Sequence, residues 1–298
     1  ERAITTTTIT SDTPDGSFVG QDVTIAFSVA IQAPSVGTAT GTVTVSDGTQ
    51  SCSSALTDGS GSCTIAFASR GPRNLVATYG GDGYAAGSAS VPEGHDVFTA
   101  TIDTTDDVVA LDGFCSLREA VQAANANGVV NECGYQAYTF DAPTPATITL
   151  ESALPPVTSN LTLTGPGASL LTISGDDAAR LFGVSATGHL ALSDLTLAQG
   201  LGDEGGAIAN YGTLSLVRTV LTENEATSYG GAIISYGPLT IQASTLSNNT
   251  AMEGGALDLE SGGATITAST LSDNSAVDVG GAIWNGSNPW DGLWHIYT

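Results

Sequence analysis

Apolar and polar residues alternate along the first ninety residues of the chain. In the segment DVTIAFSVAI, one side would carry Val23, Ile25, Phe27, Val29 and Ile31, and the other side small polar residues. This period of two is typical of an antiparallel strand with one buried face. Six or seven such segments, separated by turn signals, predict a β-sandwich over residues 1–94.

A helical period occurs in one segment, residues 116–126. Its apolar stripe consists of Leu117, Ala120, Val121 and Ala124. Ser116 precedes the stripe and Glu119 follows three residues later, which is the arrangement of a capping box, and Gly128 is the predicted stop. We therefore interpret Arg118 and Glu119 as residues that cap and anchor this helix, and we expect no catalytic role for them.

The second half of the chain repeats with a period of about 25 residues. Glycine doublets recur at 205–206, 230–231, 254–255 and 280–281, and strand positions recur at Leu190, Leu214, Leu239 and Ala264. Asn224, Asn249 and Asn274 are separated by intervals of 25. Such a period, without helical spacing inside each unit, indicates a solenoid of short strands. The predicted fold is a parallel β-helix over residues 146–298, with roughly six turns.

The residue types of the repeat fit this prediction. Stacked turns would place Ile208, Ile233, Leu257 and Ile283 in one aliphatic column, and Leu221, Leu246 and Leu271 in another. Glycine doublets suit corners that need a positive φ or a close approach of two backbones. The three asparagines are predicted to form a ladder of side-chain amides where the chain turns, since asparagine tolerates the left-handed conformation. Asp194 and Arg218 occupy the same repeat position and are predicted to form an exposed ion pair, whereas Gln242 should point outward.

The charge of the chain excludes several partners. Six arginines, no lysine and 30 acidic residues give a net charge of −24. Such a chain is not expected to bind nucleic acid or an anionic membrane surface. No run of apolar residues is long enough for a membrane span. The surface is rich in Thr, Ser, Gly and Ala instead of charge, which favours an extracellular β-rich protein.

Four cysteines form two local pairs. We predict the disulfides Cys52–Cys63 and Cys115–Cys133, because an even number of cysteines at short spacing is typical of secreted proteins. Metal binding by these cysteines is the alternative, but no CxxC motif or nearby histidine pair supports it. The first disulfide would join two adjacent strands, and the second would fasten the start of the helix to the following loop.

Three stretches resemble known bacterial families. The segments GTVTVSDGTQSC and LVATYGGDGYAAGSAS resemble bacterial Ig-like repeat domains, which implies a spacer or stalk module with Tyr79 in its core. CSLREAVQAANAN resembles the CSLREA segment that precedes β-helical repeats, so residues 95–145 are assigned to a linker and a capping segment. The repeat GGAI…L.I..STLS.N.A resembles polymorphic outer membrane proteins, which implies a right-handed β-helix outside the cell.

Carboxylates near the glycine corners raise the question of an enzyme. Asp258 and Glu260 are predicted to point outward from one strand, and a glycosidase can be built from such a pair. We interpret them as a solvated acidic face and predict no catalytic residue. Asp103, Asp106, Asp107 and Asp112 are weak candidates for a Ca²⁺ site, because Ca²⁺ prefers several oxygen ligands. A solvated loop is the favoured interpretation, and the chain is expected to need no cofactor.

These features together favour a structural protein that is secreted or displayed on the cell surface. The predicted partner is a second copy of the chain, joined end to end in a filament or fibre. Candidate assembly residues are Ile4, Thr6 and Thr8 in an extended uncharged strand, and the aromatic residues Trp290, Trp294 and Tyr297. An adhesin that binds a glycan or protein is the main alternative, and a polysaccharide-degrading enzyme is a less favoured one.

Overall fold

The computed structural model describes residues 1–134 and 137–286 of the 298-residue chain. The chain divides into two compact units, Glu1–Thr99 and Ala100–Thr298. Almost all regular structure consists of strands, and α1 (Leu117–Ala126) is the one helix among the described residues. None of the helices described there is long and apolar enough to cross a membrane.

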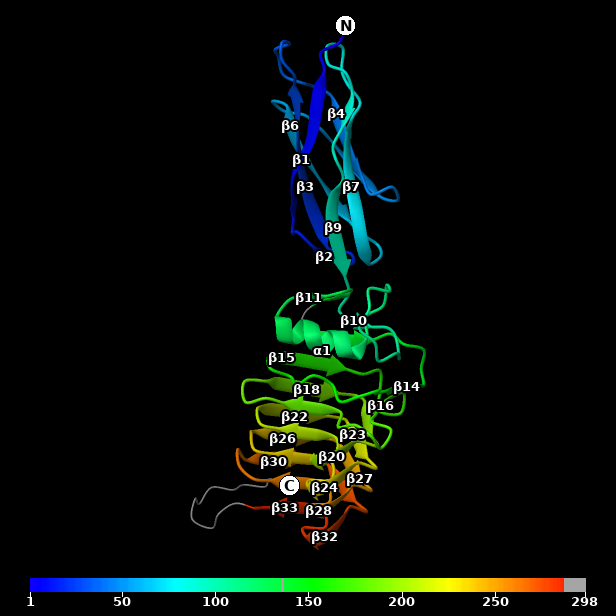
Figure 1. The fold of residues 1–298 in the computed structure, drawn as a ribbon, viewed down its shortest axis with the longest axis vertical. Helices are drawn as coiled ribbons and strands as arrows, with labels where there is room; N and C mark the ends of the chain where they lie inside the picture. The colour runs from blue at the N-terminus through cyan, green and yellow to red at the C-terminus, as the bar shows by residue number, and fades with distance from the viewer. Residues whose placement is uncertain (135–136, 287–298) are drawn as a thin grey trace. The chain divides into compact units, whose positions relative to one another are not determined.

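Unit 1 is a β-sandwich of two sheets (Figure 1). The three-stranded sheet has the order β1-β3-β6, with β1 Thr5–Thr13, β3 Asp22–Ile31 and β6 Ser60–Ala66. The second sheet has the order β2-β9-β7-β4-β5, and β8 also pairs with β7. Its strands are β2 Ser17–Phe18, β4 Thr42–Ser46, β5 Ser51–Ala55, β7 Gly71–Tyr79, β8 Ser88–Ala89 and β9 Glu93–Phe98.

The alternation in β3 sets the core of the sandwich. Val23, Ile25, Phe27 and Val29 are buried as predicted, and the Tyr79 ring is buried with its hydroxyl donating to the Thr40 carbonyl oxygen at 2.6 Å. The predicted boundary at residue 94 lies too early. The segment predicted as a linker forms β9, which pairs with β7 from Gly71 to Leu75.

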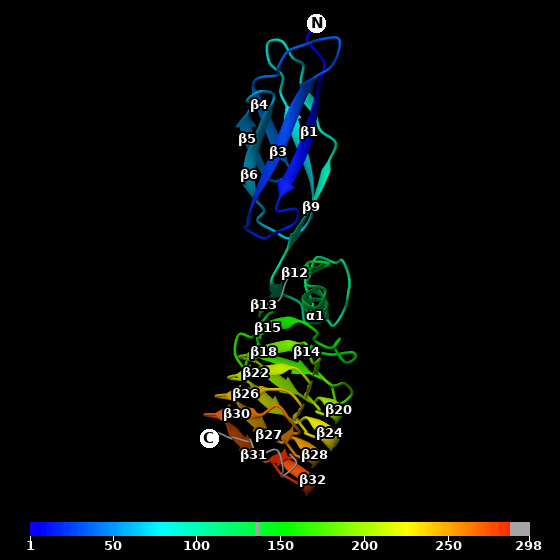
Figure 2. The same ribbon diagram turned by 90° about the vertical axis from the view of Figure 1, so that its left-hand side faces the viewer.

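Unit 2 is a parallel β-solenoid (Figures 1 and 2). Its longest sheet has the order β10-β13-β15-β18-β22-β26-β30, and the strands are Thr101–Ile102, Ala137–Phe140, Asn160–Thr164, His189–Ser193, Thr213–Val217, Leu239–Gln242 and Ala264–Thr267. A six-stranded sheet comprises β14 Ala146–Thr149, β16 Leu171–Ser174, β19 Thr196–Ala198, β23 Val220–Thr222, β27 Thr245–Ser247 and β31 Thr270–Ser272. These six strands confirm the predicted number of turns.

Two shorter sheets complete the later turns. One comprises β17 Phe182–Val184, β21 Ile208–Asn210, β25 Ile233–Ser235, β29 Leu257–Leu259 and β33 Ile283–Asn285. The other comprises β20 Leu201–Glu204, β24 Glu225–Tyr229, β28 Thr250–Glu253 and β32 Ser275–Val279. The short pair β11 Val129–Val130 and β12 Cys133–Gly134 follows the helix. Because β10 and β13 belong to the longest sheet, the solenoid sheets begin within the segment predicted as linker and cap.

The predicted register of the repeat is confirmed. Ile208 aligns with Ile233, which aligns with Leu257 and then Ile283, so that the aliphatic column is continuous. Leu221, Leu246 and Leu271 form the other column. The first glycine of each doublet has a positive φ, and a Cβ on Gly231 would lie 2.1 Å from the Gly255 carbonyl oxygen. The corners therefore need glycine for both predicted reasons.

Candidate functional site

Asp258 is the most unusual residue of the solenoid. It is the middle residue of β29, between Leu257 and Leu259, whose side chains belong to the hydrophobic core. The alternation of a strand places Asp258 on the opposite face, where its neighbours in the adjacent turns are Ile234 and Trp284. Despite this outward direction, Asp258 is 0% exposed.

Neither carboxylate oxygen of Asp258 has a hydrogen-bond partner. Burial raises the pKa of this carboxyl, and the negative charges of Glu260, Glu253 and Glu204 raise the pKa further, to about 7. No positively charged side chain contributes to this pKa shift. We call Asp258, Glu204, Glu253 and Glu260 the Asp258 cluster.

This burial corrects one sequence-based expectation. Asp258 and Glu260 were predicted to share a solvated acidic face, and Glu260 is indeed partly exposed. Asp258 lies on the outward side of its strand but is covered. A residue that is desolvated among other carboxylates without a donor is not a surface charge.

Two tyrosines lie beside the cluster on successive turns. The rings of Tyr211 and Tyr236 stack with centroids 4.9 Å apart and an interplanar angle of 4°. The Tyr211 hydroxyl donates to Oε2 of Glu204 at 3.2 Å. Burial and the negative charges of Glu204, Tyr211, Glu260 and Asp258 raise the pKa of Tyr236 to about 12. Tyr211 is 48% exposed, so this pair offers an accessible aromatic face next to carboxylates.

A shallow groove crosses the sheet that contains β24, β28 and β32. Its lining comprises Glu225, Ala226, Thr227, Thr250, Ala251, Met252 and Val277. Met252 is 45% exposed and Val277 is 80% exposed, so the groove presents apolar side chains to solvent.

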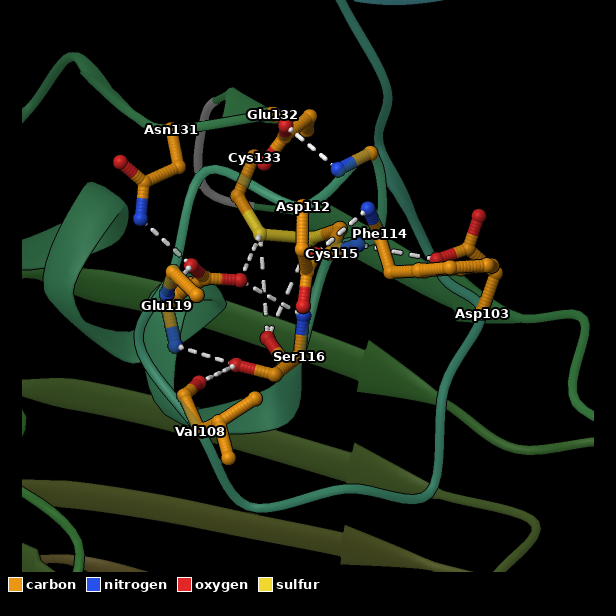
Figure 3. Close-up of a disulfide and its surroundings, with 12 residues drawn as sticks. Asp103, Val108, Asp112, Phe114, Cys115, Ser116, Glu119, Asn131, Glu132 and Cys133 are labelled. Carbon is orange, nitrogen blue, oxygen red and sulfur yellow. Dashed lines mark hydrogen bonds between the residues drawn. A yellow bond between two sulfur atoms is a disulfide. The ribbon is translucent and has the colours of Figure 1, made fainter.

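The capping segment is held by buried polar contacts around its disulfide (Figure 3). The capping box is present as predicted, because the Glu119 backbone N–H donates to the Ser116 hydroxyl and the Ser116 N–H donates to Oε2 of Glu119. Glu119 is 1% exposed, and its Oε1 also accepts from the Ala110 N–H and the Asn131 amide. Its carboxylate therefore has a structural role.

The end of the helix differs from the prediction in one detail. Gly128 was predicted as the stop, but Asn127 is the residue in the left-handed conformation, with φ of 50°. The Gly128 N–H donates to the Ala123 carbonyl oxygen at 3.1 Å. Asparagine therefore takes the position that glycine was expected to fill, because it also tolerates a positive φ.

No three of the four weak Ca²⁺ candidates bring their ligand atoms within 4.8 Å of one another. Asp107 is buried, accepts from Arg118 at 2.5 and 2.9 Å and also accepts from the Glu151 N–H. Asp103 accepts from the Cys115 N–H and Asp112 from the Phe114 N–H, as Figure 3 shows, while Asp106 is exposed. Arg118 also donates to the carbonyl oxygens of Ser152 and Ala153, so it anchors the helix to the next turn.

Unit 1 contains a buried chain of three polar side chains. The His95 Nδ1 lies 2.6 Å from Oδ2 of Asp12, and Nε2 lies 2.9 Å from the Ser17 hydroxyl oxygen. The spacing resembles a serine hydrolase triad, but Ser17 is only 1% exposed. With Asp15, Asp12 and His95 form the only group of three potential metal ligands within 4.8 Å of one another among residues 1–134 and 137–286. Both ring nitrogens are already bonded, which favours a structural role.

The asparagine ladder is confirmed, with one correction. The Asn224 Nδ2 donates to Oδ1 of Asn249 at 2.9 Å, and Asn249 Nδ2 donates to Oδ1 of Asn274 at 2.9 Å. The left-handed conformation, however, belongs to the residues before them, Glu223, Asn248 and Asp273. The ladder asparagines are selected for their amides and not for their backbone conformation.

Both disulfides and the predicted ion pair are also present. Cys52 lies on β5 and Cys63 on β6, which belong to different sheets, so this disulfide joins the two layers of the sandwich. Cys115–Cys133 connects the start of α1 to β12. Arg218 donates twice to Asp194, at 2.7 and 2.6 Å, at an exposed position. Gln242 is exposed as expected.

The assembly candidates fall into two groups. Thr6 and Thr8 face solvent on β1, which lies at the edge of its sheet, and Ile4 is 64% exposed just before it. Strand β1 is already paired with β3 along Thr5–Thr13, so it is part of the sandwich itself. Trp290, Trp294 and Tyr297 lie outside the described residues.

Comparison with known proteins identifies the first unit. A two-sheet sandwich with this core is the architecture of Ig-like domains. Residues 8–98 match the family model for the bacterial Ig-like domain (group 3). The chain therefore combines an N-terminal bacterial Ig-like domain with a β-solenoid of about six turns. No curated protein and no solved structure matches the chain.

Proposed function

We propose that this chain is a non-enzymatic structural protein of the bacterial cell surface that assembles with copies of itself into a filament or fibre. An Ig-like spacer domain, a disulfide in each unit and a solenoid with continuous aliphatic columns all suit a durable extracellular element. The negative charge opposes association, but salt screens it beyond about 8 Å.

One structural observation carries the assembly proposal. Within the described part of the chain, β30, β31, β32 and β33 each end their sheets and pair on one side only, and β1 also ends a sheet. A strand edge offers backbone groups to which another chain can bind by β-augmentation. On the last turn Val277 is 80% exposed, which adds an apolar contact.

Electron microscopy and light scattering on the purified chain test this proposal. Wild-type protein should form rods or oligomers whose size increases with concentration. Deleting residues 1–10 would remove much of β1 from its own sheet and could unfold unit 1. The point variants Ile4→Lys and Val277→Lys avoid this problem. Each of them should reduce assembly, and so should the double variant Trp290→Ala, Trp294→Ala. Val36→Lys, at an 82% exposed loop position of unit 1, is the matched control. A monomer at all concentrations would contradict the proposal.

A glycan-binding adhesin is the second candidate, because the Tyr211–Tyr236 stack offers an aromatic face beside carboxylates. A glycan array probed with wild type and with the Tyr211→Ala, Tyr236→Ala double variant tests it. Signals that the double variant loses would support the adhesin.

The absence of enzymatic activity is a separate part of the proposal. We expect no cleavage of pectin, alginate or other uronate polymers, with or without Ca²⁺. Product formation that Asp258→Asn abolishes would establish an enzyme instead, since a carboxyl with a raised pKa can act as a general acid.

A further inference from the structure

The two carboxylate oxygens of Asp258 lack a hydrogen-bond partner. A buried polar group in a native protein normally has a hydrogen bond, and a buried charge is normally paired or coordinates a metal ion. Asp258 has none of these, although it is 0% exposed. Its position is therefore incomplete as it stands.

The fold does not need an acid at this position. The equivalent residue is Ala209 two turns earlier, Ile234 one turn earlier and Trp284 one turn later. Three apolar side chains thus occupy the same place in the stack. An aspartate there weakens the solenoid without contributing a contact, unless a group that is not part of the chain binds to it.

The surroundings define the charge that a bound group would carry. Glu260 follows directly after β29, Glu253 ends β28 and Glu204 ends β20, and all three act electrostatically on Asp258. The arginines of the described solenoid turns are engaged elsewhere: Arg180 donates to the Gly205 carbonyl oxygen and Arg218 binds Asp194. Four carboxyl groups without a compensating cation call for a positively charged ligand.

We propose that Asp258, Glu253 and Glu260 bind a hard divalent cation, with Ca²⁺ as the fitting ion. All available ligand atoms are carboxylate oxygens, the type that Ca²⁺ prefers, and Ca²⁺ accepts irregular coordination that water completes. Glu253 and Glu260 are only partly buried, so their side chains can rotate and an ion can reach them. Their oxygens and those of Asp258 do not lie within 4.8 Å of one another in the free chain, so the ion would draw them together.

Two consequences distinguish a cation site from a buried acid. Protons compete with the ion for the carboxylate oxygens, so the calcium affinity should be lower at pH 5.5 than at pH 8. Bound ion should also join β28 to β29, the two strands that supply the ligands. Amide hydrogen exchange in Thr250–Leu259 should therefore slow in the presence of calcium.

The test is calorimetric titration of the metal-free full chain with CaCl₂ at pH 8. We expect one ion per chain with a Kd of about 10⁻⁴ to 10⁻³ M, the range of extracellular calcium modules. Asp258→Asn and Asp258→Ile should abolish this binding, and Glu253→Gln should weaken it at least tenfold. Circular dichroism of each variant shows whether it is folded, and Asp258→Ile should be at least as stable as the metal-free wild type.

Two control variants show where in the chain the calcium ion binds. Asp278→Asn removes an exposed carboxylate on β32 and should leave binding unchanged. Asp15→Asn removes the exposed member of the Asp12–Asp15–His95 group, and binding that persists in this variant places the ion in the solenoid. Absence of a calcium signal in the wild type, or a signal that folded Asp258→Asn retains, would overturn the proposal. Slower exchange outside Thr250–Leu259 alone would also overturn it.

Discussion

Asn249 accepts two hydrogen bonds from Asn224 on its Oδ1, from the side-chain Nδ2 at 2.9 Å and from the backbone N–H at 3.1 Å. The Asn249 Nδ2 in turn donates to Oδ1 of Asn274 and to the Leu221 carbonyl oxygen. The Asn249 side chain therefore accepts hydrogen bonds from buried groups on the preceding turn and donates a hydrogen bond to the following turn. The two outer asparagines repeat parts of this arrangement: the Asn224 Oδ1 accepts from the Gly200 N–H, and the Asn274 Nδ2 donates to the Leu246 carbonyl oxygen.

The first prediction concerns this ladder. Replacing Asn249 by Leu removes four hydrogen bonds at a fully buried position and leaves the Asn224 backbone N–H without its acceptor. We expect the free energy of unfolding to decrease by about 3 kcal/mol or more. Gln242→Leu, at an exposed position on the same turn, should change it by about 0.5 kcal/mol or less. Denaturant unfolding monitored by circular dichroism measures both, and equal midpoints would contradict the proposed role of the ladder.

The second prediction concerns the pH dependence that Asp258 introduces. The folded chain holds a proton on this carboxyl up to about pH 7, whereas the unfolded chain releases it near its ordinary pKa of about 4. The folded state therefore binds more protons between these values. Its stability should fall as the pH rises through this window and should not change further above it.

Asp258→Ile isolates this effect. In the presence of a chelator, the stability difference between this variant and the wild type should grow by about 2 kcal/mol from pH 5 to pH 8, in favour of the variant. Urea unfolding at the two pH values measures it. A difference that is independent of pH would show that Asp258 is ionised in the folded chain throughout.

The third prediction concerns the Cys115–Cys133 disulfide. It closes a loop with a sequence separation of 18, for which the chain-entropy model gives about 3 kcal/mol. The Cys115→Ala, Cys133→Ala variant should lose amide protection in α1 and the first solenoid turns. Protection in unit 1 should remain, because the chain divides into separate compact units. Non-reducing peptide mapping should find the pairs Cys52–Cys63 and Cys115–Cys133, and a Cys52–Cys115 link would contradict the structure.

The fourth prediction concerns His95. His95→Leu leaves the buried Asp12 carboxylate and Ser17 hydroxyl without their shared partner, so unit 1 should lose roughly 2 kcal/mol of stability or more. His189→Leu is the matched control, since His189 is exposed on β18, and it should have little effect. Thermal unfolding by calorimetry measures both variants. Similar melting temperatures for the two would show that the Asp12–His95–Ser17 chain contributes nothing to the sandwich.

Local patterns in the sequence predicted much of the candidate site but not its chemistry. Alternation placed Asp258 and Glu260 on the outer face of one strand, and this direction is confirmed by the core positions of Leu257 and Leu259. The alternation of apolar and polar residues does not predict whether another part of the chain covers that face. The burial of Asp258 and the approach of Glu204, from a strand two turns earlier, depend on how the sheets meet at the glycine corners.

A similar limit applies to the short-range signals that were missed. Residues 95–98 were assigned to the linker, although His95 and Val97 alternate as buried residues of β9. The six-residue segment includes glycine and charged residues, so its own pattern is weak. The segment pairs with β7, a separate strand of the sheet. The contacts of His95 with Asp12 and Ser17 connect positions about eighty residues apart, which no local pattern contains.

The sequence alone determined the solenoid, because every turn must match its neighbours residue by residue. That requirement appears as a period of 25, as glycine doublets at corners and as asparagines at equal intervals. The capping box and the strands of the sandwich likewise follow from interactions between residues close in the chain. Only the tertiary structure decided which outward residues are covered, because solvent exclusion depends on segments that are distant in sequence. The unpartnered carboxyl of Asp258, and with it the proposed cation site, can be seen only in the tertiary structure.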